Sequence, residues 1–245
     1  MKIVSTIEAR MTSSRLPGKV MMEAAGKPML QHLIERLQRV DLIDEIVIAT
    51  TKNDTDNFIE ELSKKLGVNI FRGDEDDVMN RVIGAAQSVN AEIIVEITGD
   101  CPIIDPGIIE QTIQVYLKNN VDYVSNNNIR SYPDGMDVQV FALEQLEKSS
   151  RMTDDPLDHE HVTLHIRNNP EIFSRINLFS TPELYFPDLG LTLDEKSDYD
   201  LLKKIIEHFY GIKKPFFSCL EVLDFLNDNP SLVEINRHVE RKGDT

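Results

Sequence analysis

The chain has 245 residues, a length that fits one large domain or two small ones. Hydrophobic residues make up 41% of the sequence and charged residues 28%, which is ordinary globular usage and excludes a disordered or collagen-like chain. Asp and Glu outnumber Lys and Arg by 42 to 26, which gives a net charge of −16. Because such a surface repels a phosphate backbone, we do not expect a duplex nucleic-acid binder.

The cysteines and the N-terminal residues indicate a reducing setting. Cys101 and Cys219 are too few for a disulfide framework or a four-thiolate zinc site. The first apolar run meets Glu8 and Arg10 almost at once and is too short for a signal peptide. No stretch approaches the roughly 18 apolar residues that a membrane-spanning helix needs. We therefore expect a cytoplasmic protein with neither a membrane nor a nucleic acid as partner.

Up to about residue 125, short Val- and Ile-rich runs alternate with segments of helical period. The predicted strands are Lys2–Glu8, Glu45–Thr51, Asn69–Phe71, Glu92–Thr98 and Asp122–Ser125. The predicted helices are Gln31–Val40, Thr55–Leu66, Asp76–Val89 and Pro106–Asn119. Runs such as Ile46–Ala49 are nearly all hydrophobic, which is typical of parallel strands buried on both faces. The pattern predicts the α/β class, with a mainly parallel sheet between two helical layers.

After Ser125 the strict alternation stops, and turn-forming residues become frequent. The predicted strands here are Val138–Phe141, Phe173–Phe179 and Leu191–Leu193, and the predicted helices are Leu143–Ser150, Asp158–Asn168, Asp198–Tyr210 and Leu220–Leu226. We interpret this part as a small inserted arm for substrate binding or dimerisation. Since no linker or repeat is visible, we predict a single domain. It comprises a nucleotide-binding half (1–125), a substrate half (126–210) and a C-terminal helical extension (211–245).

The loop after the first predicted strand carries three cations, Arg10, Arg15 and Lys19, among hydroxyl residues. Ligands bind at the carboxyl ends of strands in open α/β sheets. Backbone N–H groups near Ser13 and Ser14 can cradle phosphate oxygens, and the cations can donate charge-assisted hydrogen bonds to a triphosphate. The loop is not a P-loop, which needs a glycine at position 13. The alternative is a solvated cationic turn.

Two aspartates follow predicted strands and can supply the oxygen ligands that Mg²⁺ prefers. Asp100 comes after Glu92–Thr98, and Asp194 comes after Leu191–Leu193. Magnesium usually takes one or two carboxylates together with substrate phosphates, so both acids are metal-ligand candidates. The alternative is that each is an ordinary turn or helix-capping residue.

The segments Ile7–Arg10 and Ser14–Lys19 resemble the opening motif of the cytidylyltransferases that activate sugar acids. The resemblance is greatest to the spore-coat polysaccharide branch, which is related to the acylneuraminate and 3-deoxy-manno-octulosonate cytidylyltransferases. It implies a three-layer, Rossmann-like nucleotidyltransferase fold. It also implies that Ala9, Arg10, Ser14, Arg15 and Lys19 bind CTP, with Arg10 and Lys19 holding its triphosphate as catalytic residues.

Two further segments resemble the metal-binding motifs of this family. Thr98–Pro106 is similar to the motif whose aspartate binds magnesium, which assigns Asp100 as a catalytic metal ligand. Leu191–Asp194 is similar to the motif whose aspartate completes the site. One departure stands out, because many relatives carry an arginine where this chain has Gly190. The contact which that arginine makes is either missing here or supplied from elsewhere.

Three weaker matches concern the base and the acceptor. Arg72–Arg81 resembles the segment near the nucleotide base, so Arg81 is expected to reach the pyrimidine. Pro133–Val138 resembles the segment that faces the sugar, with Asp137 as the substrate contact. His159–Thr163 resembles a family Arg-Glu-His-Val-Thr motif, which assigns Glu160 and His161 to substrate binding and leaves the contact at His159 open. Each stretch can also be read as a solvated loop or turn.

Taken together, the resemblance implies a magnesium-dependent cytidylyltransferase. It would transfer a CMP moiety from CTP to a sugar or sugar acid and release pyrophosphate, in the synthesis of surface polysaccharide or another glycan precursor. A homodimer is expected. Two alternatives stay open at this point, namely a glycosyltransferase of similar architecture that uses a ready-made nucleotide sugar, and a non-catalytic nucleotide-binding module.

Overall fold

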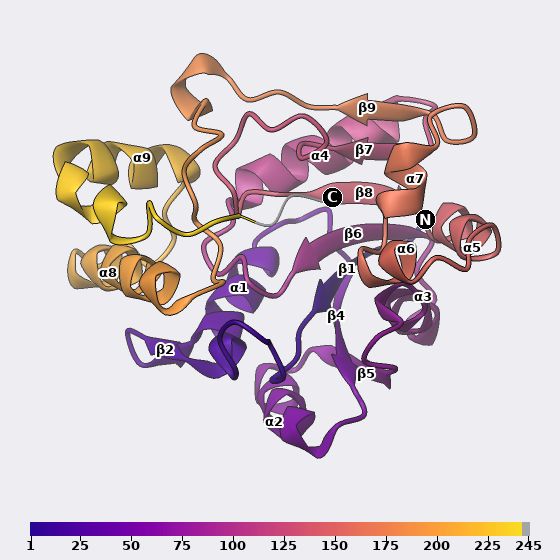
Figure 1. Cartoon of the computed structure of the whole chain (residues 1–245), viewed down its shortest axis with the longest axis horizontal. Helices are drawn as coiled ribbons and strands as arrows, with labels where there is room; N and C mark the ends of the chain where they lie inside the picture. Colours follow the sequence, from indigo (N-terminus) through magenta and orange to yellow (C-terminus); the bar gives the residue numbers. More distant parts are fainter. Residues whose placement is uncertain (242–245) are drawn as a thin grey trace.

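The computed structural model describes residues 1–241 and is built on one seven-stranded mixed sheet. The strands lie in the order β5-β4-β1-β6-β8-β7-β9 (Figure 1). Their bounds are β1 Ile3–Glu8, β4 Glu45–Thr51, β5 Asn69–Gly73, β6 Ile93–Thr98, β7 Tyr123–Ser125, β8 Gln139–Ala142 and β9 Arg175–Asn177. All neighbouring pairs are parallel except the two that involve β8, which is antiparallel to β6 and β7. The predicted mainly parallel α/β sheet is confirmed.

Helices cover both faces of the sheet and form the outer layers. The helices are α1 Met29–Leu37, α2 Asn57–Leu66, α3 Val78–Ser88, α4 Pro106–Lys118, α5 Leu143–Ser150, α6 Pro156–Glu160, α7 Leu164–Asn168, α8 Lys196–Gly211 and α9 Cys219–Asp228. Alternate β1 residues face opposite cores, because successive strand side chains point to opposite sides. Ile3 and Ile7 pack in the core with α1, α2, α4, α8 and α9, whereas Val4 packs in the core with α3, α5 and α7.

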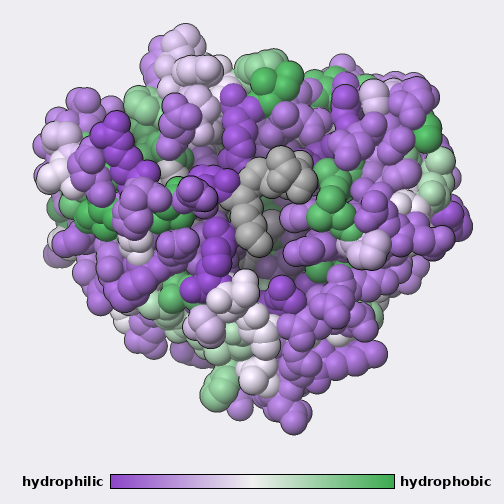
Figure 2. Space-filling model, viewed as in Figure 1, coloured by the Kyte–Doolittle hydropathy of each residue, from purple (hydrophilic) through white to green (hydrophobic). Residues whose placement is uncertain are grey.

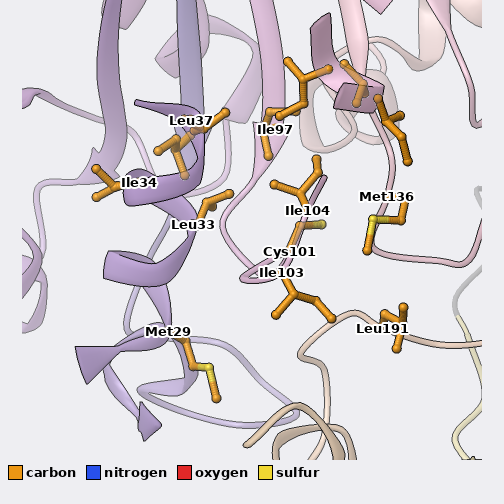
Figure 3. Close-up of a cluster of buried hydrophobic side chains, with 14 of the residues drawn as sticks. Met29, Leu33, Ile34, Leu37, Ile97, Cys101, Ile103, Ile104, Met136 and Leu191 are labelled. Carbon is orange, nitrogen blue, oxygen red and sulfur yellow. The ribbon is translucent and has the colours of Figure 1, made fainter. Parts of the chain in front are cut away.

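The larger core joins α1 to the segments that follow β6. Figure 3 shows Leu33 of α1, Ile104 and Cys101 in one cluster of buried side chains. Cys101 is 1% exposed, and burial, reinforced by neighbouring Asp100, raises the pKa of its thiol well above the ordinary value. The interpretation of Cys101 as a packing residue is confirmed.

Two predicted elements are wrong. The single helix expected over Asp158–Asn168 is split into α6 and α7, because the buried Val162 sits between them at φ 47° with its side chain in the core of α3. The strand expected over Leu191–Leu193 is absent: Leu191 and Leu193 are fully buried, but only an isolated bridge pairs Gly190 with Asp134. The alternation of apolar and polar residue types produced the strand-like pattern in the sequence, although Thr192 between the two leucines is buried as well.

The surface agrees with the acidic composition. Figure 2 shows a face covered mainly by hydrophilic residues and interrupted by small hydrophobic groups. No helix within residues 1–241 has both the length and the apolar character needed to cross a membrane. The predicted division into three parts stays a prediction. Its C-terminal extension contains α9 and the 3-10 helix Pro230–Ile235, and its last residues, 242–245, lie outside the described part of the chain.

Candidate active site

The cationic loop after β1 is folded back by a tight turn. The N–H of Gly18 donates to the carbonyl of Met11 (2.8 Å), and Gly18 adopts φ 73°, a left-handed conformation that glycine tolerates without a steric penalty. A 3-10 helix, Lys19–Met21, starts at the next residue. The N–H of Met11 also donates to the carboxylate of Asp56 (2.8 Å). The turn therefore fixes where the side chain of Lys19 begins.

Lys19 connects the two predicted metal ligands. Its Nζ lies 2.9 Å from Oδ2 of Asp100 and 3.2 Å from Oδ1 of Asp194. Arg15 pairs with the same Oδ1 of Asp194 at 2.6 Å. Burial disfavours the ammonium of Lys19, but the two carboxylates outweigh that effect and raise its pKa. Burial likewise opposes ionisation of Asp100, but Lys19 holds the pKa of that carboxyl below its usual value.

The backbone brings Asp100 and Asp194 together from distant parts of the chain. The N–H of Gly99 donates to the carbonyl of Glu8 (2.9 Å), and a Cβ at position 99 would stand only 2.6 Å from that oxygen. Glycine is therefore needed where β6 ends against β1. The N–H of Leu193 donates to the carbonyl of Asp100 (2.8 Å), which ties the second aspartate to the first.

The donor set fits a magnesium ion that shares its coordination shell with phosphates. Asp100 and Asp194 already aim one oxygen each at a single cationic group, the ammonium of Lys19. Within residues 1–241 no group of three or more His, Cys, Asp or Glu side chains is arranged to hold a metal. Two carboxylates with phosphate oxygens are a common Mg²⁺ environment, whereas an all-protein calcium or zinc site needs more ligands.

A cleft of about 380 Å³ contains this centre. Every residue that the sequence assigned to the site lines it: Ala9, Arg10, Ser14, Arg15, Lys19, Arg81, Asp100, Asp137, Glu160, His161 and Asp194. The structure thus brings together residues from the first loop, the end of β6, α3, the insert and the segment before α8. Their roles remain predictions, but their convergence is a finding.

Arg10 and Arg81 lie at the side of the cleft formed by the loop before α3. Nη1 of Arg10 pairs with Oε1 of Glu75 at 3.1 Å. Arg81 is 3% exposed, and it donates from Nε to the carbonyl of Ala49 (3.2 Å) and from Nη1 to that of Asp74 (2.6 Å). These bonds make Arg81 a support for the rim of the cleft. Its contact with a base stays a prediction.

An adjoining hollow of about 200 Å³ shares Asp137, Glu160 and His161 with the cleft. Sequence reasoning missed two of its acids, Glu8 and Glu96, which occupy the α3 face of neighbouring strands. The carboxyl oxygens of Glu8 are buried beside the carboxyl of Glu96. Burial first, and the nearby charge of Glu96 second, raise the pKa of Glu8 well above its usual value. Charged residues at inward positions of otherwise apolar strands were the available signal.

His159, which replaces the family arginine, is engaged elsewhere. Its Nδ1 lies 2.7 Å from Oδ1 of Asp77 at the start of α3. This hydrogen bond raises the pKa of His159, although burial opposes the shift. Among the described residues that line the cleft and the hollow, His159 is absent. Its imidazole therefore joins α6 to α3 instead of facing the site.

The sequence profile of the cytidylyltransferases matches residues 4–223, most of the chain. The chain belongs to the cytidylyltransferase family. It is thus a nucleotidyltransferase by family, as the sequence motifs predicted.

The chain is 37% identical to an uncharacterised protein of Methanocaldococcus jannaschii, over 99% of this chain and 97% of the relative. It is 32% identical to the spore coat polysaccharide biosynthesis protein SpsF of Bacillus subtilis, over 93% of this chain and 95% of the relative.

Two further similarities concern named cytidylyltransferases. A solved cytidylyltransferase from Leptospira borgpetersenii superposes with a TM-score of 0.90 at 32% identity, covering 99% of this chain and 100% of that one. A 3-deoxy-manno-octulosonate cytidylyltransferase of Geobacter sulfurreducens is 37% identical over 49% of this chain and 47% of its own length. The predicted nucleotidyltransferase fold is confirmed by these matches.

Proposed function

We propose that this family member transfers the CMP moiety of CTP to a hydroxyl of a sugar or sugar acid and releases pyrophosphate, with Mg²⁺ as cofactor. The observation that carries the proposal is the convergence of Arg15 and Lys19 on Asp100 and Asp194 in one cleft. A cationic loop that faces a pair of carboxylates suits a metal–triphosphate complex, because each phosphate oxygen then meets a positive charge.

In the reaction, an acceptor oxygen attacks the α-phosphorus of CTP. A new P–O bond forms, the bond to the β-phosphate oxygen breaks, pyrophosphate leaves with the electron pair, and the acceptor proton is released to solvent. Arg10, Arg15 and Lys19 hold the triphosphate and balance the charge that builds on the leaving group. On binding, Lys19 exchanges carboxylate partners for phosphate oxygens.

Asp100 and Asp194 would hold the magnesium ion. When bound, Mg²⁺ neutralises and orients the phosphates. The contribution of the chain is to place one oxygen of each carboxylate on the same side of the cleft, where both now contact the ammonium of Lys19. This preorganisation reduces the reordering that ligand binding requires.

The acceptor is proposed to occupy the hollow beside the triphosphate site. Asp137, Glu160 and His161 line both spaces, which supports their proposed role at the junction between the acceptor and the α-phosphate. The names of two relatives support a sugar or sugar acid as acceptor: one is a 3-deoxy-manno-octulosonate cytidylyltransferase and the other a spore coat polysaccharide biosynthesis protein. We therefore propose a role in surface-polysaccharide or other glycan precursor synthesis.

The test is pyrophosphate release from each of the four ribonucleoside triphosphates with Mg²⁺, against a panel of sugars and sugar acids. Release with CTP and one acceptor, lost in Asp100→Asn, supports the proposal. The exposed Asp41 provides the matched control, because Asp41→Asn makes the same chemical change at a residue that does not line the cleft. Binding of CTP without pyrophosphate release, with every acceptor, would instead favour a binding module.

Family membership favours nucleotidyl transfer over the glycosyltransferase alternative. We also propose the homodimer expected from the family resemblance, supported by large apolar side chains exposed on the insert, among them Phe179, Tyr185 and Phe186. Sedimentation of the full chain tests it. Replacement of all three by serine should yield monomers, and an unchanged sedimentation coefficient would contradict this surface as the contact.

A further inference from the structure

The structure shows why position 190 carries no side chain. A Cβ on Gly190 would lie 1.8 Å from Nη2 and 2.2 Å from Cζ of Arg241. Gly190 is not among the residues with positive φ, so its backbone does not require glycine. The space beside it is filled by the guanidinium of a residue that is 51 positions later in the chain.

Arg241 reaches from the C-terminal segment to an acidic group at the wall of the cleft. Its Nη2 donates to Oδ1 of Asp198 (2.8 Å), and its Nη1 donates to Oγ1 of Thr192 (3.0 Å). It also lies 3.8 Å from Oδ2 of Asp134 and 3.9 Å from Oδ2 of Asp194. One guanidinium with five donors in a fixed plane therefore faces three carboxylates at once.

Both hydrogen-bond partners of Arg241 contact Asp194. Oγ1 of Thr192 lies 3.5 Å from Oδ2 of Asp194 and 3.4 Å from Oδ2 of Asp134. Asp198, fully buried, accepts from the N–H of Asp194 (3.1 Å) with its other oxygen. Oδ2 and the backbone of Asp194 are thus restrained from behind, while Oδ1 faces Lys19 and Arg15 in the cleft.

Arg241 stands behind the wall of the cleft. Together with Gly190 it lines a separate outer hollow of about 460 Å³, whereas Thr192 and Asp194 line the cleft. The guanidinium therefore acts through Thr192 and Asp198 and does not itself face a nucleotide bound in the cleft. Removal of a residue that orients a metal ligand in this way commonly weakens metal binding by about 10- to 100-fold.

We propose that Arg241 is a positioning residue for Asp194, supplied from the C-terminal segment into the space that Gly190 leaves open. The inference rests on the proposed function, since it assigns Asp194 to the metal–nucleotide complex. It also explains how the chain can do without the arginine that many relatives carry at position 190, because the guanidinium of Arg241 lies beside Gly190.

The first experiment measures the Mg²⁺ concentration needed for half-maximal CTP binding by calorimetry, without acceptor. Arg241→Ala should raise this Mg²⁺ concentration about 10-fold or more. Arg241→Lys should raise it less than Arg241→Ala but still above the wild-type value, because an ammonium keeps the charge but cannot make both planar contacts. Asn236→Ala is the matched structural control. It removes a bond to the same oxygen of Asp198 (2.8 Å) and one to the carbonyl of Gly190 (2.9 Å), but within residues 1–241 the Asn236 side chain makes no hydrogen bond to Thr192 or Asp194.

A double-mutant cycle tests the shared space. Gly190→Ala should mimic Arg241→Ala, because the new methyl group displaces the guanidinium, and it should add nothing in the Arg241→Ala background. Arg237→Ala, at a side chain 73% exposed on the same segment, should behave as wild type. Gly190→Arg in the Arg241→Ala background should recover part of the lost metal affinity.

The outcomes separate the inference from the proposed function. If the wild-type protein shows no Mg²⁺-dependent binding of CTP, the proposed function fails and this role fails with it. If the wild type binds CTP but Arg241→Ala and Asn236→Ala shift the Mg²⁺ midpoint equally, Arg241 is only a structural tether. Additive effects of Gly190→Ala and Arg241→Ala would also overturn the inference.

Discussion

Replacement of Lys19 by alanine tests the proposed triphosphate site most directly. The side chain is 12% exposed, and its ammonium is shared by Asp100 and Asp194 at 2.9 and 3.2 Å. Removing one preorganised charged donor from a site of developing charge typically costs about 10²- to 10³-fold in rate, or about 2.7 to 4 kcal/mol. We expect a loss of this size in pyrophosphate release from CTP by Lys19→Ala.

The same substitution should cost little stability. The carboxylates of Asp100 and Asp194 are 24% and 11% exposed in a cleft, and Asp194 keeps Arg15 at 2.6 Å. The loss should therefore stay near 1 to 2 kcal/mol, below the roughly 3 to 5 kcal/mol of a fully buried pair that loses one partner.

The pH dependence of this loss has a definite sign. Because the pKa of Lys19 is raised in the folded state, its contribution is fully present below the unfolded value of 10.5 and is lost only as pH rises through the folded value. The pKa of Asp100 is lowered, so its contribution is present above 3.8 and is lost as pH falls. Unfolding at pH 7 and 8 should give the same difference, and Lys19→Ala should show a weaker loss of stability in acid.

The assays are pyrophosphate release and urea unfolding of the same preparations. The matched control is Lys64→Ala, which removes a helix-surface pair with Glu60 from a side chain 70% exposed. It should change stability by about 0.5 kcal/mol or less and leave the rate unchanged. Full turnover by folded Lys19→Ala, under conditions where Asp100→Asn is inactive, would refute the assignment of Lys19 to the triphosphate.

Three further perturbations follow from the structure. Glu8→Gln should raise the free energy of unfolding by about 1 to 2 kcal/mol at pH 8. The raised pKa of Glu8 means that the folded protein loses stability as this carboxyl ionises with rising pH, whereas the neutral amide of Gln does not ionise and can donate a hydrogen bond to Glu96; equal stability of the two proteins at pH 8 would contradict this. Gly99→Ala should cost about 1 to 3 kcal/mol in urea unfolding and reduce pyrophosphate release, since its methyl group would meet a backbone carbonyl at 2.6 Å. His159→Ala should lower stability more at pH 5.5 than at pH 8.5, because the pKa raised by Asp77 makes the charged pair a low-pH contribution; a pH-independent difference would argue against an ion pair.

Local pattern was sufficient for most of the fold. The bounds of β4 and α5 agree with the prediction residue for residue, because their apolar spacing and flanking polar residues are unambiguous. The loop of Arg10, Arg15 and Lys19 was also predicted, as was Asp100, since each follows a strand whose end meets one edge of the sheet. Asp194 was predicted to line the site too, although the strand expected before it is absent.

Long-range packing decided what local pattern could not. Val162 breaks the helix expected over Asp158–Asn168 because its burial against the α3 core outweighs the helical preference of its neighbours. Leu191 and Leu193 alternate like strand residues, yet their burial comes from the core between helices and not from a ladder. Burial alone therefore imitates a strand in the sequence.

The sequence by itself determined the α/β class, the strand-end motifs and the chemical nature of the cleft, because those depend on side-chain type and short-range spacing. Only the tertiary structure decided that Glu8 and Glu96 share an acidic hollow, that Arg81 supports the rim, and that Arg241 stands beside Gly190. These contacts join residues far apart in the chain. No local spacing encodes such contacts, since they depend on how separate elements pack in three dimensions.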